Sequence, residues 1–383
     1  MNTKIPQNQN GAHNSAPSHN QNVRRRHVQR DVARVPGKTY FLILVTTVIL
    51  LFAFLLSFVV VLLKYKVDDS PFSSEWGSDT NLDGSFGGNS NVNTSNVSIG
   101  GNLPGKTVAK RTSYISSRAS DVEYITDAIR ARNVILVDLD SYQSIVEKSA
   151  DTKMYPASMT KIMSLIIACE NVKDLGQTFV VTQDIVDYSV RMGGSGVGLK
   201  VGDELSVQDL MYLTAYQSDT IAVIMLANCV AGSEAEFVKL MNAKAQQLKL
   251  TNTQFANCTG LHDPNNYTTC REMAAILAYA LENPLCYELL TSYKGYRAGG
   301  KYLVYSSWYS GRFDDKPRLN TVTVTGGKTG YIDESGFCLA SYAIGRSNGK
   351  KYIQVIVGQP KGSGYREELS VKDIKYVYNN FAE

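Results

Sequence analysis

The feature that most limits what this chain can fold into is an apolar run near its N-terminus. Residues 40–63 contain no charged side chain. At about 1.5 Å per residue, a helix of this length crosses a hydrocarbon core of about 30 Å. A cleaved signal peptide has a shorter apolar region and a small-residue cleavage site, whereas this run ends in VVVLLKYK. The sequence therefore predicts a permanent transmembrane helix over residues 39–64.

The charges on either side of this run predict its orientation. The basic residues that closely precede it are Arg24, Arg25, Arg26, Arg30, Arg34 and Lys38, and only Lys64 and Lys66 closely follow it. Because basic flanks stay in the cytoplasm, we expect a cytoplasmic N-terminus and an extracellular remainder, in a single-pass protein of the cell membrane. The formal net charge of +4 owes much to this flank, so it is no argument for a nucleic acid partner.

Composition divides the rest of the chain. Residues 1–38 are rich in Asn, Gln, Ser and Arg, which predicts a disordered cytoplasmic tail. Residues 65–110 are mainly Ser, Asn, Gly and Asp, including GGNSNVNTSNVSIGG, which predicts a flexible stalk. A stalk of this length lets a tethered domain sample roughly a few tens of Å above the membrane. Residues 111–383 remain as one extracellular domain.

Cysteine and histidine usage limits the chemistry of that domain. The six cysteines form no C-x-x-C pair, so zinc-site spacing is absent and we expect no metal and no cofactor. Cys258 and Cys270 flank a polar loop and either close it as a disulfide or are two buried thiols; both alternatives stay open. His262 alone follows the apolar run. H-E-x-x-H metal chemistry is therefore excluded, and we interpret His262 as loop structure.

The candidate nucleophile lies in the segment YPASMTKIM, residues 155–163. Ser158 and Lys161 are three positions apart, so on a helix they share a face and a neutral amine can take the hydroxyl proton. Burial and a second nearby cation would lower the lysine pKa toward the working pH. A second S-x-x-K begins at Ser347, but it contains Asn348-Gly349 between two apolar runs, which is a hairpin signature.

Periodicity predicts an α+β fold. Helices are expected at Asp121–Asn133, at Ser158–Asn171, and over much of residues 184–281, with Ser206 and Ser370 as N-caps of two helices. Strands are expected early, at Val134–Asp140 and Ser144–Glu147, and late, at residues 321–325, 336–344 and 352–358. These segments predict one antiparallel sheet built from both ends of the domain, flanked by helices, with an inserted helical lobe. The active site is expected in the cleft between lobe and sheet.

A second motif, TGGKTG, covers residues 325–330 and comes just after an apolar strand. Together with YPASMTKIM, GLKVGDELSVQDLMYLTAYQSD, MNAKAQQLKLTNTQFANCTGLHDPNNYTT and GGKTGYIDESGFCLA, it resembles the penicillin-recognising serine enzymes. The resemblance covers roughly residues 115–383, and the blocks occur in the family's order. The specific likeness is to D-alanyl-D-alanine carboxypeptidases of peptidase S11 type, the low-molecular-mass penicillin-binding proteins, with their β-lactamase/transpeptidase-like fold.

The resemblance implies a role for each matched residue. Ser158 would be acylated and Lys161 would be its base. Lys328, Thr329 and Gly330 would bind the substrate's terminal carboxylate, and the backbone N–H groups of Ser158 and Tyr331 would form an oxyanion hole. Arg366 resembles a late arginine of the family that faces the same carboxylate. A solvated surface charge is the other interpretation of Arg366.

The middle motif departs from the family pattern. Tyr216-Gln217-Ser218 stands where Ser-x-Asn is expected, with Asp219 as the following aspartate. Tyr216 would occupy the serine's position, and we expect its phenol to relay protons between the two lysines. Ser218 replaces an amide with a shorter group that lacks the second donor. The loss of one oriented hydrogen bond is worth on the order of 1 kcal/mol.

The resemblance therefore implies hydrolysis of the terminal D-Ala-D-Ala bond of peptidoglycan stem peptides in cell wall biogenesis, with β-lactams as inhibitors. One alternative is a β-lactamase, but the closest match to its E-x-x-L-N loop is Glu282–Cys286, which lacks the asparagine. The other alternative is a catalytically weak wall-binding or β-lactam-sensing protein, suggested by the altered middle motif.

Overall fold

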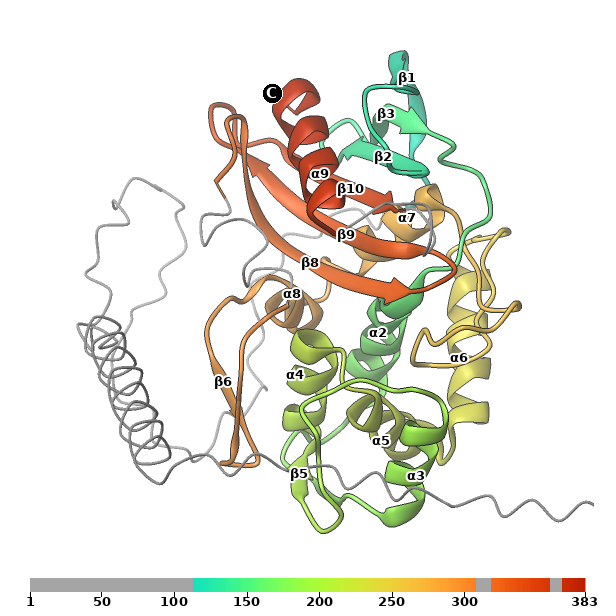
Figure 1. Cartoon of the computed structure of the whole chain (residues 1–383), viewed down its shortest axis with the longest axis vertical. Coiled ribbons are helices and arrows are strands. Elements are labelled where there is room, and N and C mark those ends of the chain that lie inside the picture. Colours follow the sequence, from blue (N-terminus) through green and yellow to red (C-terminus); the bar gives the residue numbers. More distant parts are fainter. Residues whose placement is uncertain (1–112, 308–317, 359–366, 383) are drawn as a thin grey trace, which may run out of the picture. The chain divides into compact units, whose positions relative to one another are not determined.

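A six-stranded sheet organises the part of the chain that the structure describes. The computed structural model describes residues 113–307, 318–358 and 367–382 (Figure 1). The sheet has the order β1-β3-β2-β10-β9-β8. Its strands are β1 (Ser117–Tyr124), β2 (Asn133–Asp138), β3 (Gln143–Lys148), β8 (Val322–Ile332), β9 (Gly336–Gly345) and β10 (Lys351–Val357). The early and late strands therefore form one sheet, as predicted.

The sheet is mixed, which corrects the prediction of a purely antiparallel one. β1 pairs parallel with β3, and all other neighbours pair antiparallel. The helix expected at Asp121–Asn133 is also wrong, because residues 117–124 form β1 and no helix follows before β2. Val122, Ile125 and Ile129 do repeat at helical spacing, but pairing with β3 outweighs this weak local preference.

The end of the domain follows the prediction in part. β9 and β10 form the expected hairpin, with Gly349 at a positive φ of 69° in its turn. The last helix, α9, covers Glu367–Phe381 and so begins before the predicted N-cap Ser370. The Asp373 carboxylate of α9 accepts hydrogen bonds from the backbone N–H groups of Arg130 and Ala131, at 3.1 and 2.7 Å. These two bonds connect α9 to the segment before β2.

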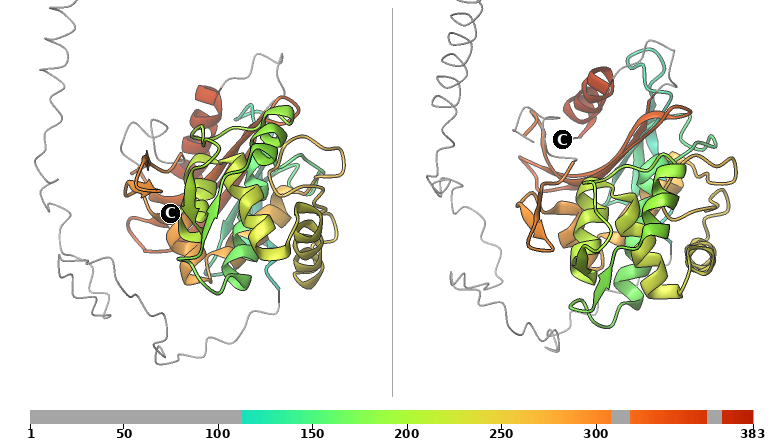
Figure 2. Two further views of the ribbon diagram at one scale, coloured as in Figure 1. Left: turned by 90° about the horizontal axis from the view of Figure 1, so that it is seen from below. Right: turned by 60° about the horizontal axis from the view of Figure 1, so that its bottom comes forward.

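Helices cover both faces of the sheet (Figure 2). α9 packs on one face, where Ile374, Val377 and Tyr378 are fully buried against it. The helical lobe covers the other face. Its helices are α2 (Lys161–Asn171), α3 (Gln183–Arg191), α4 (Val207–Gln217), α5 (Thr220–Ala231), α6 (Glu234–Gln247), α7 (Cys270–Ala280) and α8 (Pro284–Thr291). The hairpins β4 (Thr178–Val180)/β5 (Glu204–Ser206) and β6 (Tyr296–Ala298)/β7 (Tyr302–Val304) lie within the same part of the chain.

Two predictions for the lobe helices are confirmed, the N-cap of α4 and the burial of α2. Ser206 caps α4 in a capping box, because its side chain accepts from the Asp209 N–H while Asp209 accepts from the Ser206 N–H. α2 is central and nearly all its residues are buried, as expected of a helix whose apolar residues nearly encircle it. A buried helix holds the residues at its N-terminus rigidly.

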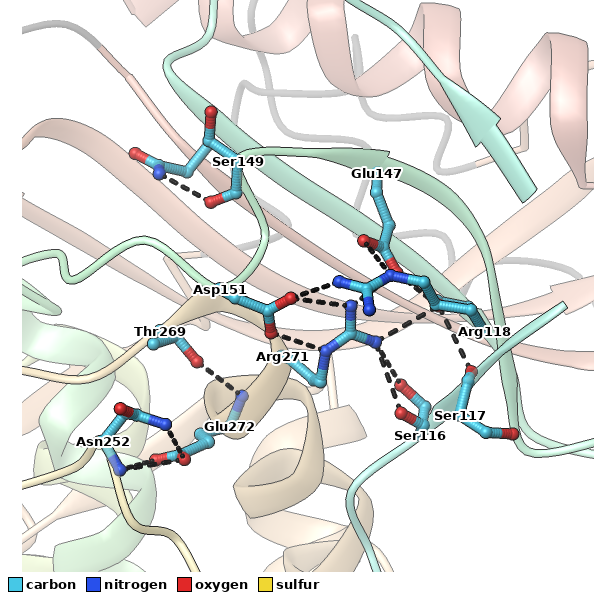
Figure 3. Close-up of polar contacts among 12 residues, drawn as sticks. Ser116, Ser117, Arg118, Glu147, Ser149, Asp151, Asn252, Thr269, Arg271 and Glu272 are labelled. Carbon is cyan, nitrogen blue, oxygen red and sulfur yellow. Dashed lines mark hydrogen bonds and ion pairs between the residues drawn. The ribbon is translucent and has the colours of Figure 1, made fainter.

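A buried ion-pair network joins the lobe to the sheet (Figure 3). Arg271, at the start of α7, donates to Glu147 of β3 at 2.5 Å and to Asp151 at 2.7 Å. It also donates to the Ser116 carbonyl and the Ser144 hydroxyl, at 3.3 and 3.2 Å. Burial raises the pKa of Glu147, but hydrogen bonds from Ser144 and Arg271 outweigh burial and lower it. The network holds the start of α7 in a fixed position next to β3.

Cys258 and Cys270 are both free, buried thiols in the structure. The Cys258 sulfur lies 3.2 Å from a carboxylate oxygen of Glu234, and burial raises the pKa of both thiols well above the usual range. Of the two alternatives, the structure has the pair of buried thiols and no disulfide.

The predicted transmembrane helix at 39–64 lies outside the described residues, as do the tail and the stalk. Among the residues that are described, no single helix has the length and hydropathy needed to cross a bilayer. One bent pair, α5 and α6, passes that test of length and composition only when the two helices are counted together.

Candidate active site

Ser158 lies in a tight turn at the N-terminal end of α2. Residues Ala157–Thr160 form a 3₁₀ turn, η1, and α2 begins at Lys161, so the predicted helix from Ser158 starts one turn later as an α-helix. Ala157 is fully buried and has a positive φ of 49°, a conformation that costs an L-residue energy and persists where its surroundings impose it. Ser158 itself is partly exposed, which leaves its hydroxyl accessible.

Lys161 lies beside this hydroxyl, as the spacing predicted. Its Nζ is 3.2 Å from Ser158 Oγ and 2.6 Å from the Thr259 carbonyl. The side chain is only 1% exposed. Burial lowers the pKa of Lys161 to about 8, against the opposite pull of nearby Asp219. Near-neutral solution therefore contains a useful fraction of the neutral amine, which is the form that can accept a proton.

The loop Asn257–Gly260 holds the other side of Lys161, and sequence reasoning did not single it out. The Asn257 side-chain carbonyl accepts from the Thr259 and Gly260 N–H groups, at 3.2 and 2.7 Å. Gly260 has φ of 79°, and an added Cβ would collide with the Ala157 carbonyl. The loop therefore supports both the base and the turn that carries Ser158. The only signal for it in the sequence was the matched block containing NCTGLHD.

β8 brings the second motif to the same place. It is an edge strand of the sheet, as predicted for K-T-G. A Cβ added at Gly330 would come within 2.8 Å of the Ser158 backbone nitrogen, so the glycine permits the strand to lie directly against η1. Lys328 is fully buried and Thr329 is 8% exposed. The Lys328 ammonium donates to the Ser218 hydroxyl and, at 3.1 Å, to the Thr329 carbonyl.

The middle motif is arranged differently from the prediction. Ser218, in the left-handed conformation with φ of 55°, ends α4 and hydrogen-bonds Lys328. The Tyr216 ring packs edge-on against Tyr212, one turn earlier, at 5.2 Å between centroids. Its hydroxyl is buried without a hydrogen-bond partner among the described residues. Burial raises the pKa of Tyr216, Ser292 lowers it and Glu288 raises it.

The relay role expected of the Tyr216 phenol stays a prediction. Tyr216 lies two residues before Ser218, and at about 100° per residue the two side chains leave α4 in nearly opposite directions. One turn before Tyr216, the Tyr212 hydroxyl donates to Glu288 of α8 at 2.6 Å. The hydroxyl beside Lys328 comes from Ser218 instead.

The remaining predicted site residues have mixed outcomes. Tyr331 follows Gly330 on β8, is 57% exposed and donates to Asp333 at 3.1 Å. The oxyanion-hole roles of the Ser158 and Tyr331 N–H groups stay predictions. His262 packs edge-on against Tyr155 with its ring 3.7 Å from Glu334, in keeping with loop structure. Arg366 lies outside the described residues.

Glu282, the closest match to a β-lactamase base, contacts described residues other than Ser158 and Lys161. It accepts a hydrogen bond from Tyr114 and lines a cavity of about 260 Å³ together with Ile166, Glu170 and Cys286. Neither Ser158 nor Lys161 lines that cavity.

The family match and the most similar relatives that we compared agree with one another. Residues 119–361 match the peptidase S11 family, described as D-alanyl-D-alanine carboxypeptidase. The D-alanyl-D-alanine carboxypeptidase DacF of Bacillus subtilis is 32% identical over 242 residues, which are 60% of this chain and 58% of the relative. DacA of Haemophilus influenzae is 29% identical over 277 residues, covering 70% of this chain and 67% of the relative. The chain thus spans just over half the length of the Bacillus relative.

Among solved structures, penicillin-binding protein 5 from Haemophilus influenzae resembles this chain with a TM-score of 0.57 and 27% identity. The likeness covers 66% of this chain and 72% of the other. The described part of the chain therefore has a penicillin-binding, transpeptidase-like α+β fold, with a mixed sheet flanked by helices.

Proposed function

The chain belongs to the peptidase S11 family of D-alanyl-D-alanine carboxypeptidases, and on that premise we propose that it removes the terminal D-alanine of peptidoglycan stem peptides through an acyl-enzyme on Ser158. The observation that carries the proposal is the buried Lys161 amine, 3.2 Å from Ser158 Oγ, with its pKa lowered to about 8. A serine next to such a base becomes a nucleophile without histidine.

The reaction proceeds in two halves. In the first, Lys161 takes the Ser158 proton, the serine oxygen attacks the carbonyl carbon of the penultimate D-alanine, and the terminal D-alanine leaves after its amine nitrogen gains a proton. In the second, water adds to the ester, releases the shortened peptide as an acid and returns the proton to Ser158. Each half needs a group that moves a proton at the cleft.

Ser218 is placed to serve the leaving group. Its oxygen accepts from the Lys328 ammonium, so the hydroxyl's own proton remains available to donate toward the cleft. Lys328 and Thr329 supply a positive charge and a hydroxyl for the substrate's terminal carboxylate, as the family resemblance implies. The role expected of the Tyr216 phenol thereby passes to Ser218.

The proposal includes a place for the enzyme. Residues 39–64 anchor it in the membrane by one helix, with the N-terminus in the cytoplasm and residues 111–383 outside the cell. There the substrate is the cell wall, and β-lactams act as inhibitors by acylating Ser158. The support is the sequence pattern of the apolar run and its basic flank.

Labelling with a fluorescent penicillin tests the acyl-enzyme. We expect covalent labelling of the full-length chain and none of Ser158→Ala, and we expect D-alanine release from an N-acylated tripeptide ending in D-Ala-D-Ala. A wild-type chain that takes up no label and releases no D-alanine refutes the enzyme and leaves a wall-binding role. Labelling without D-alanine release instead indicates a slow, sensor-like protein.

A further inference from the structure

A short segment connects the lobe to the second motif beside the candidate site. Residues Tyr305–Ser307, called the strap below, follow β7 directly. Ser306 is 2% exposed, whereas the Tyr305 side chain is half exposed. An added Cβ at Gly295 would come within 2.8 Å of the Tyr305 ring, so the ring lies closely against this glycine. The strap therefore packs closely against the rest of the domain, and the contacts below place it between α4 and β8.

The middle motif holds one end of the strap. The Gln217 side chain donates from Nε2 to the Tyr305 carbonyl at 2.7 Å. The Ser307 N–H donates to the Tyr216 carbonyl at 3.0 Å. Gln217 occupies the variable position of the three-residue motif Tyr216-Gln217-Ser218. The sequence did not indicate a role for it, whereas its hydrogen bond to Tyr305 positions the strap. Two hydrogen bonds thus fix the direction in which the strap leaves the lobe.

The K-T-G motif meets the other end. Ser307 Oγ and Thr329 Oγ1 are 2.9 Å apart, and Thr329 follows Lys328, whose ammonium is buried beside Ser218. At this separation one hydroxyl donates its proton to the oxygen of the other. When an anion enters, both can rotate to donate, one to each oxygen of a single carboxylate, and hydrogen bonds to ionised groups are the stronger kind.

We propose that Ser307 is a substrate-binding residue that joins Thr329 in holding the terminal carboxylate of the acyl-D-alanyl peptide, and that Gln217 is the positioning residue that aims it. The inference rests on the proposed function and adds to it a residue that recognises the free carboxylate next to the scissile amide. The strap thereby contributes to carboxylate recognition, whereas Ser218 serves the leaving group.

The test compares a ligand with and without that carboxylate. Full-length wild type, Ser307→Ala, Ser307→Thr and Gln217→Ala are acylated by benzylpenicillin and by its methyl ester, and the second-order rate constants are measured. Ser307→Ala should lower the rate constant for the acid about tenfold and leave that for the ester unchanged. Ser307→Thr keeps a hydroxyl and should restore the preference for the acid.

Gln217→Ala separates positioning from binding. It should lower the acid-to-ester ratio in the same direction by a smaller factor. In the double variant Gln217→Ala/Ser307→Ala it should add little to the effect of Ser307→Ala, because Gln217 acts only through the position of Ser307. In D-alanine release, Ser307→Ala should raise KM for the tripeptide with little change in kcat, which a general loss of structure would not produce. Ser347→Ala, an exposed serine in the β9–β10 turn, is the matched control and should behave as wild type.

An unchanged acid-to-ester ratio in Ser307→Ala overturns the inference while the proposed function stands. A wild-type chain that neither benzylpenicillin nor its ester acylates, and that releases no D-alanine, refutes the proposed function and the inference with it.

Discussion

Lys161 illustrates how one buried side chain changes the chemistry available to its neighbour. In water its amine would be protonated near pH 7 and useless as a base. Burial removes the water that stabilises the charge and lowers the pKa to about 8. The Thr259 carbonyl at 2.6 Å orients the nitrogen, so that the amine is ready to accept the Ser158 proton.

The first prediction is a pH profile for acylation. With a pKa of about 8, the neutral fraction of Lys161 rises about fivefold between pH 7 and pH 8 and levels off by about pH 9. The rate of penicillin acylation should follow this rise. Circular dichroism over the same pH range checks that the protein stays folded. A rate that is flat from pH 6 to pH 9 would exclude Lys161 as the titrating base.

The second prediction separates the two hydroxyls of the middle motif. Ser218→Ala removes a hydroxyl that accepts a hydrogen bond from the Lys328 ammonium. A hydrogen bond to a charged group is worth about 1.5–3 kcal/mol, so D-alanine release should slow about 10- to 100-fold. Tyr216→Phe removes a hydroxyl with no partner among the described residues, and turnover should stay within about twofold of wild type. The reverse order of effects would restore the phenol as the relay.

Secondary-structure elements place these side chains by close contact with one another. β8 can lie against η1 because Gly330 has no side chain, and α7 is held to β3 by Arg271 and two carboxylates. Since α7 packs in the core of the lobe beside α2, a movement of α7 would be transmitted to the helix that carries Lys161. The ion-pair network therefore supports the site from a distance.

The third prediction concerns that network. Arg271→Met keeps the apolar stem but leaves buried Glu147 with only the half-exposed Arg118, 3.0 Å away, as a cation. Because Arg118 still offsets part of the charge, the change should cost roughly 2–4 kcal/mol of the free energy of unfolding, measured in urea at pH 7, somewhat less than the loss of a sole buried partner. Lys239→Ala, which removes an exposed ion pair with Glu236, should cost less than about 1 kcal/mol. Equal losses would show that the network adds nothing beyond a surface pair.

The same network predicts acid sensitivity. The pKa values of Glu147 and Asp151 are both lowered in the folded chain, the latter chiefly by hydrogen bonds from Arg271. A lowered folded pKa contributes stability above the unfolded value, near pH 4, and that contribution is lost as the pH falls through the folded value. Wild type should therefore lose stability more steeply below about pH 4 than Arg271→Met.

Taken as one molecule, the chain combines a domain of the peptidase S11 family with a predicted anchor. The sheet separates α9 from the helical lobe (Figure 1), and the site residues come from the lobe and from the edge strand that faces it. An edge strand leaves backbone groups open for an extended substrate chain. Such a site suits a peptide of the cell wall, and a tether would hold the domain where that peptide is made.

The fourth prediction tests the anchor. Full-length protein should sediment with the membrane fraction, and a chain lacking residues 1–64 should remain in the soluble fraction with unchanged penicillin labelling of Ser158. The physical reason is the apolar run of residues 40–63, which has no charged side chain. Full-length protein found in the soluble fraction would instead indicate cleavage or a different role for this run.

Several features could be predicted because neighbours in the sequence decide them. The Ser158–Lys161 contact depends on three positions of one turn, the Asn348-Gly349 hairpin on two residues, and the Ser206 cap on the next turn of α4. The spacing of side chains within a helix or strand is set by backbone geometry alone. The α+β class follows from the order of such segments.

The tertiary structure decided the contacts between residues far apart in the chain. Lys161 meets the Thr259 carbonyl across 98 positions, and Lys328 meets Ser218 across 110. Pairing with β3 turned a helical pattern into β1, and the buried Tyr216 ring packs edge-on against Tyr212. In each case the free energy of burial and pairing exceeds the local preference of the residue, which is at most about 1 kcal/mol.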